Sequence, residues 1–124
     1  MALSIRSIRP FLGSRDFLLS CRFYRELGFE EISLEKGFSL FQRGSFAFYL
    51  QDAFVSDWVN NTMVFAEIES PEAYLKELQE KNLERIFPGV RIESMVIRPW
   101  GKEFFVHDPS GILWHFGSFF PSGK

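Results

Sequence analysis

The stretch from Arg98 to Phe116, RPWGKEFFVHDPSGILWHF, constrains the fold more than any other part of the chain. Glu103–His107 and Ile112–Phe116 are rich in aromatic and β-branched residues, which predicts two strands. Between them, Asp108-Pro-Ser-Gly111 has the residues of a tight turn: Asp begins it, Pro fixes φ, and Gly permits the conformation that follows. The stretch is therefore predicted to be a β-hairpin. A hairpin this apolar needs a helix on one face and a partner or ligand on the other.

Two helices are predicted from capping residues and apolar spacing. The first covers Asp16–Leu27, where Asp16 is the N-cap and the apolar residues share one helix face: Phe17, Cys21, Tyr24 and Leu27. Gly28 ends this helix in a left-handed conformation. The second covers Ser70–Lys81, where Ser70 is the N-cap, a proline follows at the first helical position, and an acid lies in the first turn.

Strands are predicted on either side of these helices, at Ser4–Leu12, Phe29–Ser33, Phe38–Gln42, Ser45–Leu50, Thr62–Glu69 and Val90–Ile97. Pro10 has no N–H, which favours an edge or exchanged strand. Gln51–Asn61 reads as a polar linker and Leu83–Gly89 as a loop. The order is βαβββ twice, an α+β fold with halves at about 4–52 and 62–119 of one domain spanning 1–124. Residues predicted to be buried toward the helices are Val64, Ala66, Ile68, Trp114 and Phe116.

Composition narrows the function classes. The 124-residue chain has a net charge of −2 and no basic run, which argues against nucleic acid as its main partner. Its apolar runs are too short to span a membrane, and Met1–Pro10 has no apolar segment of a signal peptide. The single cysteine, Cys21, cannot form an internal disulfide, which fits a cytoplasmic protein. Aromatic residues make up 18% of the chain, which indicates a Phe-rich core or an aromatic cleft or interface.

Two motifs resemble one known family. Pro99-Trp100-Gly101, Glu103-Phe104 and Asp108-Pro109-x-Gly111 resemble the last hairpin of the glyoxalase/bleomycin resistance/dioxygenase superfamily, also called vicinal oxygen chelate proteins, and its bleomycin-resistance branch in particular. Ser20-x-x-Phe23-Tyr24-Arg25-x-Leu27-Gly28-Phe29 resembles that family's first helix and the strand entry after it. The resemblance implies two tandem βαβββ modules forming a curved mixed sheet around a concave cleft, with the helices on the convex side.

The resemblance also implies where a metal would bind. The family's metal-dependent members hold their ligands on the first and last strands of each half, and the motif spacing carries those positions to Arg9, Phe48, Met63 and His115. A divalent metal needs three or four converging His, Glu or Asp groups, and only His115 qualifies. His107, the other histidine, lies at the far end of the hairpin. We therefore expect no metal and no cofactor.

Strand parity predicts an aromatic cleft lined by Arg9, Phe11, Phe46, Phe48, Met63, Phe65, Leu113 and His115, with Trp58 and Trp100 in loops that could close over it. Such a surface suits a planar or partly aromatic molecule stacked on the rings, with an anionic or polar group bound by Arg9.

The resemblance implies a homodimer that sequesters a small molecule, such as an antibiotic, in clefts at the dimer interface and breaks no bond. One alternative is an enzyme of the superfamily: a lyase, isomerase or dioxygenase with an unusual metal shell, or a metal-free member that uses His115 as a base. The other is a protein-interaction module with an aromatic face.

Overall fold

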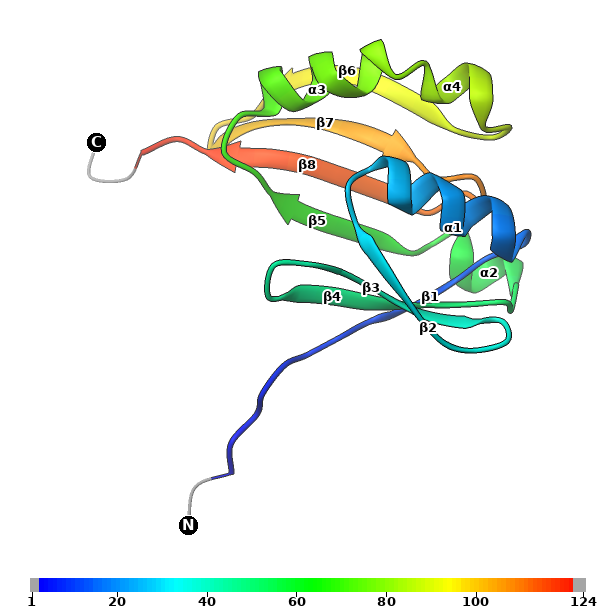
Figure 1. The fold of residues 1–124 in the computed structure, drawn as a ribbon. Helices are drawn as coiled ribbons and strands as arrows, with labels where there is room; N and C mark the ends of the chain where they lie inside the picture. Colours follow the sequence, from blue (N-terminus) through cyan, green and yellow to red (C-terminus); the bar gives the residue numbers. More distant parts are fainter. Residues whose placement is uncertain (1–2, 122–124) are drawn as a thin grey trace.

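The computed structural model describes residues 3–121 and contains two βαβββ modules in tandem (Figure 1). The first consists of β1 (Phe11–Gly13), α1 (Phe17–Glu26), β2 (Glu30–Glu35), β3 (Phe38–Arg43) and β4 (Phe46–Gln51). The second consists of β5 (Met63–Glu67), α3 (Pro71–Glu80), β6 (Arg91–Ile97), β7 (Gly101–His107) and β8 (Leu113–Phe119). Two short helices complete the chain: α2 (Ser56–Val59) between the modules and α4 (Leu83–Ile86) after α3.

The strands form two four-stranded sheets, in the orders β1-β4-β3-β2 and β5-β8-β7-β6. In each sheet the first strand pairs in parallel with the last, and the remaining pairs are antiparallel. The predicted α+β fold with two tandem modules is confirmed. The prediction that the Pro10 segment leads into an edge strand is also confirmed, because β1 borders only β4.

Local capping explains why both predicted helices form where they do. The Asp16 carboxylate accepts a hydrogen bond from the Leu19 N–H at 3.1 Å, and the Ser70 hydroxyl accepts one from the Ala73 N–H at 3.2 Å. Each side chain satisfies a main-chain donor that has no partner inside the helix. Gly28 has φ +104° after α1, the left-handed conformation that glycine adopts without a Cβ penalty.

Three segments differ from their predictions. The strand predicted at Ser4–Leu12 is shortened to β1, and the preceding residues run away from the body of the protein (Figure 1). The segments predicted as linker and loop contain the short helices α2 and α4. Each helix buries one aliphatic side chain, Val59 at 3% and Leu83 at 1% exposure, and these buried contacts hold the two segments against the core.

The two sheets share a core because their inner, helix-facing sides meet. Tyr24 of α1 lies between them, with its ring 4.9 Å from that of Phe48 in β4 and 5.7 Å from that of Trp114 in β8. The Tyr24 hydroxyl donates to an Asp108 carboxylate oxygen at 2.6 Å and accepts from the Trp114 indole N–H at 3.0 Å. The other Asp108 oxygen accepts three main-chain N–H groups, those of Ser110, Gly111 and Ile112. Helix α1 of the first module is thus tied to the β7–β8 turn of the second.

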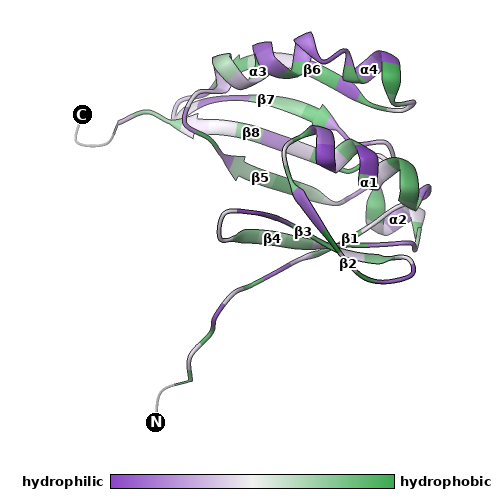
Figure 2. Cartoon of the chain, in the orientation of Figure 1, coloured by the Kyte–Doolittle hydropathy of each residue, from purple (hydrophilic) through white to green (hydrophobic). Residues whose placement is uncertain are grey.

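The strands that border the module junction are apolar on both faces, and Figure 2 shows strong hydrophobic colouring along β4 and β5. Trp114 and Phe116 are buried, as predicted. Val64, Ala66 and Ile68 also turn inward, but they are only half-buried because they line a cavity between the modules. Among residues 3–121, no helix is both long and apolar enough to cross a membrane.

Candidate functional site

The outer face of the first sheet, opposite α1, carries a stack of three rings. The Tyr49 ring of β4 lies 4.8 Å from that of Phe11 and 5.3 Å from that of Phe38, and the two phenylalanine rings lie 6.0 Å apart. The Arg9 guanidinium donates to the Tyr49 hydroxyl at 3.1 Å and lies 5.8 Å from the centre of that ring. We call Arg9, Phe11, Phe38 and Tyr49 the first aromatic surface. It offers flat rings next to one positive charge.

The outer face of the second sheet carries a larger set of exposed side chains. Trp100, just before β7, has its ring 5.0 Å from Phe119 and 5.9 Å from Phe65. His115 lies beside Phe65, with ring centroids 6.3 Å apart. Met63 completes this group and is 64% exposed. We call Met63, Phe65, Trp100, His115 and Phe119 the second aromatic surface.

Trp100 reaches this surface because the chain packs closely at Gly101. A Cβ at Gly101 would lie 2.0 Å from the Ser118 carbonyl oxygen, so no other residue fits there without moving β8. The Trp-Gly pair of the motif thereby sets the tryptophan at the edge of the sheet while β7 and β8 stay paired.

The buried carboxylate of Glu103 lies beneath the second aromatic surface. Glu103 of β7 is 4% exposed and accepts hydrogen bonds from Arg98 at 2.8 Å and from His115 at 2.9 Å. Burial disfavours its charged form, but the bonds from His115 and Arg98 outweigh burial and hold the pKa of Glu103 below its usual range. The surface thus contains one imidazole whose orientation is fixed by a carboxylate.

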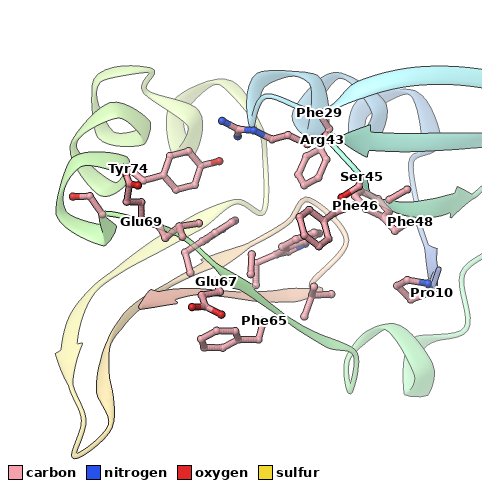
Figure 3. A pocket seen from close by; sticks show the side chains of 18 of the residues that line it. Pro10, Phe29, Arg43, Ser45, Phe46, Phe48, Phe65, Glu67, Glu69 and Tyr74 are labelled. Carbon is pink, nitrogen blue, oxygen red and sulfur yellow. The ribbon is translucent and has the colours of Figure 1, made fainter. Parts of the chain in front are cut away.

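A cavity of about 1350 Å³ lies on the inner side, between the modules (Figure 3). Its walls are mostly apolar and include Phe29, Phe46, Phe48, Val64, Ala66 and Trp114, and Phe65 and Phe119 of the second aromatic surface also border it. At one end the Tyr74 hydroxyl and the Arg43 guanidinium both donate to the Leu27 carbonyl oxygen, at 2.9 and 3.3 Å. Burial raises the pKa of Tyr74 to about 12, so its hydroxyl stays protonated at neutral pH.

The prediction that Phe48 faces the cleft opposite the helices is wrong. Phe48 points toward α1 and is 4% exposed, with its ring packed on Tyr24. Phe46 has the same strand parity but lies beyond the covered part of the sheet, where it is 77% exposed and lines the inner cavity. The residue of β4 that does face outward is Tyr49, which pairs with Phe11 just as His115 pairs with Phe65.

The other predicted site residues divide between two surfaces. Arg9 and Phe11 belong to the first, and Met63, Phe65, Trp100 and His115 to the second. No ring of one surface pairs with a ring of the other within residues 3–121. Trp58 lies in α2 and is 73% exposed, without an aromatic partner in the described part of the chain.

Sequence reasoning missed Phe38, Tyr49, Glu103 and Phe119. The signal for Tyr49 was available in the strand pattern, because a parallel partner of Phe11 must share its face. No local signal marks Glu103 as buried, since its partner His115 is on another strand and Arg98 lies before the turn into β7.

Within the described residues, no three His, Cys, Asp or Glu side chains converge in the way a metal site needs. Of the four positions carried over from the metal-dependent proteins, His115 lies next to Met63, with Nε2 3.5 Å from Sδ. Arg9 is bound to Tyr49, and Phe48 is in the core. His107 contacts the Glu93 carboxylate at the end of β7, on the same outer face as His115, and pairs with Leu113 of β8.

These features define a class of fold: two βαβββ modules whose inner faces share one core and whose outer faces carry exposed rings. No protein-family model and no curated protein matches the chain by sequence. Solved structures do match, and the fold of the chain is that of the bleomycin-binding and bleomycin resistance proteins.

Three of these structures illustrate the match. A bleomycin resistance determinant encoded on the transposon Tn5 has 21% identity and a TM-score of 0.77, covering 91% of this chain and 97% of its own. The bleomycin-binding protein of Streptomyces verticillus, complexed with copper(II)-bleomycin, has 22% identity and a TM-score of 0.74, covering 94% and 98%. An antibiotic-binding protein from a Streptomyces species has 17% identity and a TM-score of 0.75, covering 96% and 100%.

Proposed function

We propose that the protein binds a planar or partly aromatic small molecule and sequesters it without breaking a bond. The observation that carries this proposal is the pair of outer surfaces, on which Phe11, Met63, Phe65, Trp100 and Phe119 are each at least 38% exposed. Apolar patches of this kind mark binding sites on proteins that remain dissolved in water. The shared fold with proteins complexed with bleomycin supports the same function class.

We propose further that the site is completed by a second copy of the chain. Each aromatic surface is one wall only, and ring stacking on both sides of a flat ligand needs a second wall. In a two-fold dimer, the first aromatic surface of one copy faces the second surface of its partner, and symmetry makes two equal clefts. The extended residues 3–10 add exposed Leu3, Ile5 and Ile8, which also favour contact with a second chain.

The charges suggest the polarity of the ligand. Arg9 supplies a positive charge beside the stacked rings of the first surface and suits an anionic or polar group. The proposed ligand-binding residues are therefore Arg9, Phe11, Phe38, Tyr49, Phe65 and Trp100, with Met63 and His115 at the same surface. Phe46 and Phe48 are assigned to the inner cavity instead, and Trp58 is left outside the site.

Thermal-shift screening of planar aromatic compounds tests the proposal, because a saturating ligand raises stability. With a ligand found in this way, calorimetric titration of Phe65→Ala should show binding weaker by about two- to tenfold from lost stacking alone. Arg9→Met should weaken an anionic ligand, with a smaller effect at high salt. Phe46→Ala is the matched control, because it removes an exposed ring from the inner cavity.

The control also decides where the ligand binds. Parent-like affinity in Phe65→Ala and Arg9→Met together would refute the outer surfaces as the site. Loss of binding in Phe46→Ala alone would place the ligand in the cavity between the modules.

The second candidate function is catalysis, and the Glu103–His115 pair favours it because a carboxylate-oriented imidazole is a competent base. A binding protein should tolerate His115→Gln within a few-fold, whereas an enzyme that depends on His115 should lose about 100-fold or more in turnover. Elemental analysis of protein purified without chelator should find less than one metal ion per chain. A tightly held stoichiometric metal would favour the enzyme.

A further inference from the structure

The position of protons around Glu103 can be worked out from its contacts. A carboxylate has no proton and can only accept hydrogen bonds, so both neighbours must donate to it. Arg98 Nε donates to one oxygen at 2.8 Å, and His115 Nδ1 approaches the other at 2.9 Å. The side chain of Glu103 is only 5% exposed, which leaves little room for water to replace either partner.

The imidazole of His115 is therefore held in one tautomer. In the neutral ring Nδ1 carries the single proton, so Nε2 has a lone pair and acts only as an acceptor. The neighbour of Nε2 is Met63 Sδ at 3.5 Å, and a thioether has no proton to offer. Among residues 3–121 Nε2 has no donor, and the side chain is 21% exposed.

The Nε2 lone pair of His115 lies among apolar aromatic side chains. The ring of Phe105 on β7 lies 5.1 Å from the His115 ring at a steep angle, and the Phe65 ring lies 6.3 Å from it at 30°. A ligand ring stacked on Phe65 would reach Nε2 with an edge substituent. A ligand ring bound there would exclude water from Nε2, and a polar group left unpaired on burial weakens binding.

We propose that the second aromatic surface selects ligands whose aromatic body carries an N–H or O–H donor, which binds to Nε2 of His115. Arg98 and Glu103 are positioning residues that fix the imidazole tautomer. This inference rests on the proposed function, which places a ligand on this surface. The inference adds that the ligand is the donor in its hydrogen bond to His115. A ligand that presents only an acceptor to Nε2 is rejected, since two lone pairs then face each other.

The first measurement needs no ligand. Long-range proton–nitrogen NMR correlations of the protein labelled with ¹⁵N-histidine distinguish a protonated ring nitrogen from an unprotonated one. At about pH 8.5, above the usual histidine pKa of about 6.5, we expect His115 to show a protonated Nδ1 and an unprotonated Nε2. A protonated Nε2, in the other tautomer or in an imidazolium ion, would overturn the inference.

The second measurement uses two flat bicyclic probes of similar size, indole as a donor and quinoline as an acceptor. Indole should bind about two- to tenfold tighter than quinoline, the range for one net hydrogen bond, and should shift the Nε2 signal. Equal affinities on this surface would refute the selection while leaving the proposed function intact. If neither probe perturbs the signals of His115, Phe65 or Trp100, the proposed binding surface itself fails.

Glu103→Gln tests the positioning role. Arg98 requires the amide oxygen, so the amide NH₂ faces His115 and donates to Nδ1, which moves the ring proton to Nε2. The preference should then reverse in favour of quinoline. Glu93→Gln is the matched control, because Glu93 contacts the other histidine, His107, across the neighbouring strand pair β6–β7. It should alter the His107 signals only. If Glu103→Gln does not fold, the parent tautomer and the two probe affinities still decide the matter.

Discussion

The Tyr24 hydroxyl is one of the points at which the modules are joined, and Tyr24→Phe should destabilise the protein strongly. The substitution removes one oxygen from a ring that is 0% exposed and adds no atom. It leaves Asp108 without its 2.6 Å donor and the Trp114 indole N–H without its 3.0 Å acceptor. Each buried polar group without a partner costs about 1–3 kcal/mol. The free energy of unfolding should therefore fall by about 2–6 kcal/mol, a large part of the stability of a typical domain.

Urea denaturation followed by circular dichroism measures this loss. Tyr49→Phe is the matched control, because its hydroxyl lies on the outer face and only accepts from Arg9. The control should change stability by less than about 0.5 kcal/mol, as surface substitutions do. If Tyr24→Phe also changes stability by less than about 0.5 kcal/mol, the hydrogen bonds that join Tyr24, Asp108 and Trp114 do not hold the modules together.

Two further predictions concern pH and assembly. Burial raises the pKa of Cys21 to about 12 and that of Tyr74 to about 12, so above about pH 9 the unfolded chain releases protons that the folded chain keeps. Stability should fall with rising pH by about 1.4 kcal/mol per pH unit for each such group, and a flat profile in urea melts between about pH 8 and 11 would contradict this. Sedimentation should show a dimer at micromolar concentration, and Phe65→Glu should convert it to a monomer; a monomeric parent would remove the two-chain cleft.

Sequence patterns predicted the helices and the module order because these depend on local chemistry. Asp16 and Ser70 cap helices through contacts three residues away, and Gly28 ends α1 through its own φ. Asp108 organises its turn through the next four residues. Such signals survive in a single sequence because both partners are neighbours in the chain.

The sequence did not predict correctly which side chains of β4 face outward, because this depends on the length of the turn before the strand. Matching Gly44 to Gly111 places Phe48 over His115, but the two turns differ. Arg43 pairs with Phe46 around Gly44 and Ser45, whereas His107 pairs with Leu113 around the longer segment 108–112. A slip of one residue exchanges the two faces of a strand, so Tyr49, and not Phe48, takes the outer position.

The three tryptophans lie in three different environments, at 73% exposure for Trp58, 38% for Trp100 and 3% for Trp114. Indole emission shifts with the polarity of its surroundings, so the protein carries a separate fluorescent reporter in each zone. Trp114, beside Tyr24, reports on the junction of the modules, whereas Trp100, beside Phe65 and Phe119, reports on the outer face. Trp58 marks the segment between the modules. Single-tryptophan variants could thus separate opening of the core from events at the surface without any added label.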